Sequence, residues 1–115
     1  MRQAPRSRLR EAGLNALGGR IGSRGVRRLF VRFCHEIERF SDGFEIEAGP
    51  FDLSLRDAAS GFAVVVSPLR EIFLVSIGEG RSCDLRVSSV DGFVTALDCA
   101  VTRYLAAASK ATPPA

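Results

Sequence analysis

The chain has 115 residues, of which 46% are hydrophobic and 25% are charged, a composition typical of one globular domain and not of a disordered chain. Its net charge of +3 hides a division, because residues 1 to 32 carry nine arginines and one acid, whereas the remainder has seven basic and twelve acidic residues. No apolar run reaches the ~18 residues of a membrane span or forms a signal peptide. We therefore expect a cytoplasmic protein, although the Arg-rich start is also typical of a mitochondrial targeting segment.

Residues 1 to 25 are predicted to form a flexible basic arm. They include Pro5 and five glycines, which would interrupt any helix that Leu9, Leu14 and Leu17 could support. We therefore expect the folded domain to begin after this arm, at residue 26.

A helix is predicted over residues 26 to 40, where apolar side chains recur every three or four positions. After the Ser-Asp-Gly sequence at residues 41 to 43, which should end the helix, apolar residues recur at every second position, and this alternation indicates half-buried strands. Strand segments are expected over residues 44 to 47, 51 to 56, 62 to 66, 72 to 77 and 83 to 88. Gly49-Pro50 leaves two interpretations of the first two segments: a turn between separate strands, or a bulge in one long strand.

The last predicted element is a helix that begins at Ser88 or Ser89 and ends near residue 108. Its apolar residues are expected to form one stripe facing the core: Phe93, Val94, Leu97, Val101, Tyr104 and Leu105.

Together these elements predict an α+β fold over residues 26 to 109. A four-stranded antiparallel meander is flanked by an N-terminal and a C-terminal helix (α-β-β-β-β-α), both packed on one face of the sheet, because short connections favour antiparallel neighbours. Residues 110 to 115 should fray.

The sequence contains no motif for catalysis, a cofactor or a metal, so we expect a non-enzyme. His35 is the sole histidine, and on a helix its neighbour Cys34 points about 100° away, so the two cannot chelate one ion. The cysteines lack a CxxC spacing and are interpreted as free thiols. A dyad of His35 with Cys83 or Cys99 is conceivable, but no signature residues accompany it.

The first functional prediction is a protein-interaction module, adaptor or chaperone-like, that self-associates through the sheet. Because residues 62 to 66 and 72 to 75 are continuously apolar, apolar side chains should emerge on both faces of the sheet, including the face without helices. Two alternatives stay open for residues 62 to 66: either Ala63 and Val65, or Phe62, Val64 and Val66, emerge on the face without helices. The predicted contact residues are Phe62, Val64, Val65, Val66 and Phe73.

The alternative is nucleic-acid binding through the basic segment, whose arginines could neutralise phosphates. The predicted contact residues are Arg20, Arg24, Arg27, Arg28 and Arg32. The order of elements resembles the α-β-β-β-α order of double-stranded RNA-binding domains, which implies an RNA partner. The chain departs from that family by an additional strand, and Arg103 is the only basic residue between residues 91 and 108, where the family has a lysine cluster. We therefore rank protein binding above nucleic-acid binding.

Overall fold

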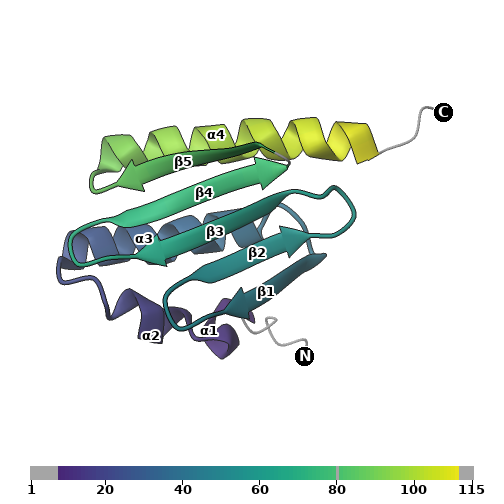
Figure 1. The fold of residues 1–115 in the computed structure, drawn as a ribbon. Helices are drawn as coiled ribbons and strands as arrows, with labels where there is room; N and C mark the ends of the chain where they lie inside the picture. The colour runs from purple at the N-terminus through teal and green to yellow at the C-terminus, as the bar shows by residue number, and fades with distance from the viewer. Residues whose placement is uncertain (1–7, 80, 112–115) are drawn as a thin grey trace, which may run out of the picture.

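The computed structural model describes residues 8 to 79 and 81 to 111. One layer is an antiparallel sheet in which each strand pairs with the next along the chain, and helices cover its rear face (Figure 1). The strands are β1 (Phe44–Ala48), β2 (Leu53–Asp57), β3 (Ala63–Pro68), β4 (Phe73–Glu79) and β5 (Arg81–Val87). The helices are α1 (Arg8–Ala12), α2 (Leu14–Gly18), α3 (Arg24–Glu38) and α4 (Val90–Ala111). The predicted α+β class and the antiparallel sheet between flanking helices are confirmed.

The sheet has five strands, which corrects the predicted four. β1 and β2 are separate, with Ala48 opposite Leu53, and a turn joins them. The Gly49 amide closes this turn by donating a hydrogen bond to the Asp52 carbonyl over 2.8 Å. A Cβ atom at Gly49 would come within 2.9 Å of a carboxylate oxygen of Asp52, so a larger residue at position 49 would displace the Asp52 side chain. Pro50 lies outside the strands, where its missing N–H costs no ladder hydrogen bond.

Residues 8 to 22 pack onto the core, in contrast to the flexible arm that was expected there. Leu9, Leu14 and Ile21 are fully buried, and Leu17 nearly so. Gly13 has a φ of 104°, so it turns the chain between α1 and α2, and both helices form on either side of it. Burying one such aliphatic side chain stabilises the fold by about 1.5 to 3 kcal/mol, which offsets the weak helix propensity of these short segments. The core therefore begins well before the predicted boundary at residue 26.

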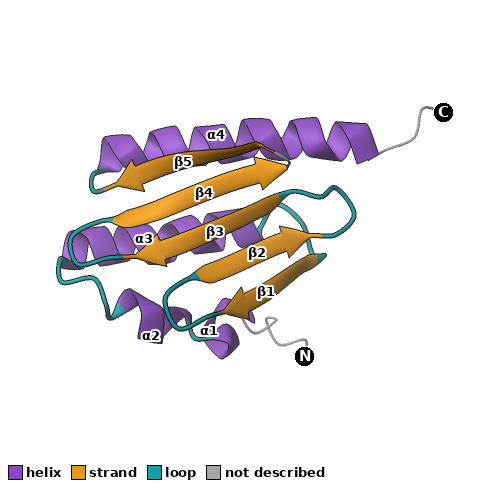
Figure 2. Cartoon of the chain, in the orientation of Figure 1, coloured by secondary structure: helices purple, strands orange, loops and turns teal. Residues whose placement is uncertain are grey.

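Helices α3 and α4 lie side by side behind the sheet (Figure 2). Phe30 and Phe33 of α3 pack against Phe73 of β4, with ring centroids 5.6 and 6.0 Å apart. Small residues form the buried side of α4 together with Phe93: Ala96, Ala100 and Ala107. Alanine lets the backbone of α4 approach the sheet closely, so this helix is held mainly through a narrow strip of its surface.

Candidate partner-binding surfaces

The sheet face that carries no helix was predicted to hold the partner contact, and the structure corrects most of that prediction. Phe62, Val64, Val66 and Phe73 are fully buried on the helix-covered face. The alternation of side chains along a strand leaves Val65 half-buried on the opposite, open face. Of the five predicted contact residues, Val65 alone is available to a partner.

The open face of the sheet is mostly polar. Ser54 and Ser76 flank Val65 on the neighbouring strands. Leu74 is 37% exposed and stands opposite Arg86. These residues border a shallow depression of about 480 Å³, lined by Val65, Ser67, Leu74, Val75, Ser76, Asp84, Leu85 and Arg86. The apolar centre of this face is therefore small and surrounded by polar groups.

The outward side of α4 is considerably more apolar than the open sheet face. Val90, Val94 and Leu105 are 65%, 56% and 61% exposed, and Val101 is 36% exposed. The sequence predicted that Val94, Val101 and Leu105 would face the core, and the structure corrects this. The missed signal is the helical spacing of the alanines at positions 96, 100 and 107. At 100° per residue they share one side of α4, and that side, next to the predicted stripe, is the one that is buried. We call the exposed Val90, Val94, Val101 and Leu105, together with the partly buried Leu97 between them, the α4 stripe.

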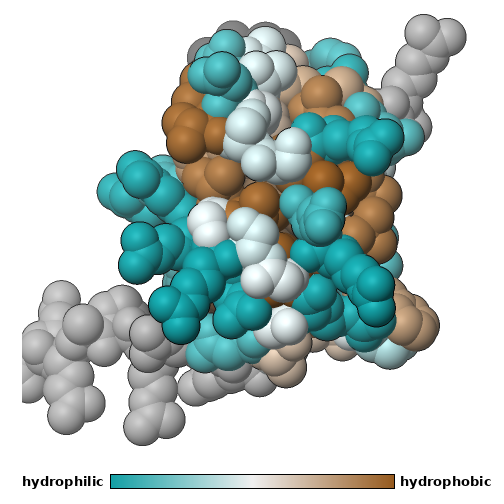
Figure 3. Space-filling view, turned by 90° about the vertical axis from the view of Figure 1, so that its left-hand side faces the viewer, coloured by the Kyte–Doolittle hydropathy of each residue, from teal (hydrophilic) through white to brown (hydrophobic). Residues whose placement is uncertain are grey.

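Arginines of α3 border this stripe on one side. A groove of about 440 Å³ between the two helices is lined by Arg28, Leu29 and Arg32 from α3 and by Val90 at the start of α4, among other residues. The Arg32 guanidinium lies 5.8 Å from the ring centroid of Phe93, which places it against α4. Figure 3, a view of the end where both helices begin, shows hydrophobic surface gathered in the upper half, at the level of α4, and hydrophilic surface dominating the lower half.

Aspartates border the stripe on its other side. Tyr104 packs against Phe40, two residues beyond the end of α3, with ring centroids 5.2 Å apart, so Tyr104 marks the side of α4 turned toward the end of α3. At 100° per residue, Asp98 lies about 120° around the helix axis from Tyr104, and Asp91 lies close to Asp98 in direction. Both aspartates are exposed. The helical layer thus presents an apolar stripe between a basic and an acidic border.

Two of the five arginines predicted to contact nucleic acid bind backbone carbonyls of the chain itself. Arg20 donates a hydrogen bond to the Pro50 carbonyl over 2.9 Å and stacks on the Phe51 ring at 4.7 Å. Arg27 donates to the Ile21 carbonyl over 2.7 Å. These guanidinium groups fasten the N-terminal segment to the domain. The other three predicted arginines are exposed on α3: Arg24, Arg28 and Arg32.

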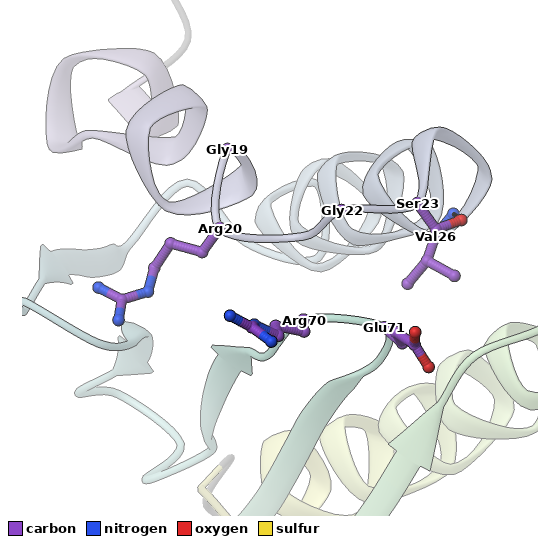
Figure 4. A pocket seen from close by; sticks show the side chains of 7 residues that line it. All are labelled: Gly19, Arg20, Gly22, Ser23, Val26, Arg70 and Glu71. Carbon is purple, nitrogen blue, oxygen red and sulfur yellow. Dashed lines mark hydrogen bonds between the residues drawn. The ribbon is translucent and has the colours of Figure 1, made fainter.

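A third hollow, of about 630 Å³, lies where the α2–α3 connection meets the β3–β4 turn (Figure 4). The Gly22 amide joins these two segments by donating to the Arg70 carbonyl over 2.7 Å. Arg20, Arg70 and Glu71 are its charged lining residues. The hydroxyl of its lining residue Ser23 accepts a hydrogen bond from the Val26 amide as the N-cap of α3, and Glu71 supplies the one carboxylate of the lining, so these side chains do not form a general acid–base pair.

The thiols and the histidine do not form the dyad considered from the sequence. His35 lies 3.9 Å from the Glu38 carboxylate and, within the part of the chain that the structure describes, makes no hydrogen bond to a cysteine. Burial raises the pKa of the Cys34 thiol far above its usual value, and the Glu38 carboxylate adds to the rise. Cys83 and Cys99 are both half-buried, with sulfur atoms 3.8 Å apart.

Among residues 8 to 79 and 81 to 111, no group of three or more histidine, cysteine or acidic side chains is arranged to hold a metal ion. None of the helices described is both long enough and apolar enough to cross a bilayer. No protein-family model matches the chain, and searches among curated proteins and solved structures find no similar protein.

Proposed function

We propose that this chain is a small, non-enzymatic protein-binding module that pairs with a second copy of itself through the outward face of α3 and α4. The observation that carries the proposal is the exposed α4 stripe between two borders of opposite charge. The contact lies on the helical face and not on the predicted sheet face, because four of the five predicted sheet residues are buried.

Exposed apolar area supplies the driving force. Removing apolar surface from water stabilises an association by about 25 cal/mol per Å², and contiguous apolar patches on small proteins usually mark contacts. Val90 and Leu105 lie at the two ends of the stripe, about four turns apart on α4. A stripe of this length suits another helix better than it suits a small molecule.

The charged borders favour one particular pairing. A two-fold axis parallel to α4 would place Asp91 and Asp98 of each copy opposite Arg28 and Arg32 of the other. An axis perpendicular to α4 would instead place like charges together. Opposite charges at the rim of an apolar contact set orientation more than affinity. We therefore propose a dimer in which the two α4 helices run parallel.

Sedimentation velocity of the full chain at micromolar concentrations tests this proposal. The unmodified protein should sediment as a dimer, and the double variant Val94→Lys/Val101→Lys should raise the dissociation constant about tenfold or more, because lysines would be buried in the contact. Val65→Lys on the open sheet face is the matched control and should leave the dimer intact. A monomeric unmodified protein, or dissociation caused by Val65→Lys alone, would overturn the proposal.

The second candidate function is nucleic-acid binding, which a separate observation favours. Arg24, Arg28 and Arg32 recur every four residues along the exposed side of α3, a spacing that aligns them in one row. Replacing all three by glutamine should abolish retention on an RNA column at low salt if this row binds phosphate. Unchanged retention would eliminate the row as a nucleic-acid contact.

A further inference from the structure

We infer that Cys83 and Cys99 form a dithiol that a hydroperoxide oxidises to an intramolecular disulfide. The two residues come from different elements, β5 and α4, and their sulfur atoms face each other at 3.8 Å. The Cys99 thiol donates a hydrogen bond to the Cys83 sulfur. This inference does not depend on the proposed dimer.

The geometry requires little movement. A disulfide bond is about 2.05 Å long, so the two sulfur atoms, now 3.8 Å apart, must approach each other by less than about 2 Å. Small rotations about the side-chain bonds of both residues supply this approach, while β5 and α4 keep their places. Both side chains are half-buried, so a small oxidant in solvent reaches them. Cys34, by contrast, is fully buried among apolar residues.

A positive charge near the two cysteines also favours formation of the thiolate that oxidation requires. Burial raises the pKa of the Cys99 thiol, and the hydrogen bond with Cys83 acts in the same direction. The Arg103 guanidinium, which hydrogen-bonds to Cys99, opposes this rise. Arg103 thus provides a positive group beside the sulfur pair, where a thiolate must form during oxidation.

The reaction balances with one hydroperoxide, ROOH, as the oxidant. One thiolate attacks the terminal peroxide oxygen and the O–O bond breaks; the alkoxide RO⁻ leaves and takes up the proton that the thiol released, which gives the alcohol ROH. The resulting sulfenic acid is attacked by the second sulfur, which forms the S–S bond and releases water. The two thiols together lose two electrons and two protons, and the peroxide is reduced. The new bond ties α4 to the edge strand of the sheet.

Oxidation of the purified, fully reduced chain with hydrogen peroxide tests the inference. The thiol count measured in denaturant should fall from the three cysteines of the chain to one, with a mass loss of two hydrogen atoms, and dithiothreitol should reverse both changes. Peptide mapping under non-reducing conditions should recover one linked peptide pair, containing Cys83 and Cys99. The thermal unfolding midpoint should rise, because the cross-link restricts the unfolded chain.

Single variants provide the controls. Cys34→Ser should still form the disulfide, whereas Cys83→Ser and Cys99→Ser should not, and circular dichroism should show that all three are folded. Oxidation that yields mainly disulfides between chains, a bridge containing Cys34, or sulfinic acid without any disulfide would each overturn the inference.

Discussion

The two broad faces of this molecule differ in how completely they hide their apolar residues. On the open sheet face, strand alternation turns polar side chains such as Ser54 and Ser76 to solvent, and Val65 and Leu74 are the large apolar side chains among them. On the helical face, α4 has an apolar arc wider than the strip it buries, because it packs at one side of the sheet over β4 and β5. A strand divides its residues between two faces, whereas a helix can expose a large part of an apolar arc.

The largest expected effect tests the sheet side of this comparison. Val64 and Val65 are neighbours on β3, yet Val64 is fully buried and Val65 faces the open side. Val64→Lys should destabilise the fold by about 4 kcal/mol or more, because it buries an unpaired charge, and should leave little folded protein. Val65→Lys should change stability by less than about 1 kcal/mol. Urea unfolding followed by circular dichroism measures both, and equal losses would contradict the assignment of the faces.

The next largest effect concerns the N-terminal part of the helical layer. Leu9→Ala should lower the free energy of unfolding by about 2 to 5 kcal/mol, because the structure buries this side chain completely. A flexible arm would show no change. Leu105→Ala, on the exposed stripe, is the matched control and should cost well under 1 kcal/mol in the monomer.

A smaller effect tests which strip of α4 is buried. Ala100→Leu should destabilise the fold by about 1 to 3 kcal/mol, since the close contact between α4 and the sheet leaves no room for a larger side chain. Val101→Leu, one residue further along, should be nearly neutral because position 101 is exposed. Thermal unfolding monitored at low protein concentration compares the two, and the opposite order would mean that α4 is rotated about its axis.

The smallest effect is a pH dependence that comes from Cys34 on the buried side of α3. The unfolded chain releases the Cys34 proton near the usual thiol pKa, whereas the folded chain retains it because burial raises the pKa. Stability from this group is therefore complete below the usual pKa and decreases by about 1.4 kcal/mol per pH unit above it. Cys34→Ala should remove that slope, as measured by urea unfolding at several alkaline pH values. An unchanged slope would show that other groups cause it.

The sequence alone determined the fold class and most element boundaries, because period-two and period-3.6 patterns are local properties. The helix beginning near residue 26, the strands from residue 62 onward and the final helix all lie close to their predicted positions. The turn at Gly49-Pro50 had two local solutions, and pairing of Ala48 with Leu53 selected the turn over the bulge. The local glycine pattern in residues 8 to 22 gave no sign that Leu9 and Leu14 reach the core.

The candidate surfaces were decided only by the tertiary structure. Which face of β3 is covered depends on where α3 and α4 pack, and no property of residues 62 to 66 by themselves distinguishes Val64 from Val65. The exposed arc of α4 depends on how far that helix lies over the edge of the sheet. The sulfur atoms of Cys83 and Cys99, sixteen residues apart, meet only because β5 and α4 are packed together. Burial and proximity are properties of the packed chain, and a pattern read along the sequence contains neither.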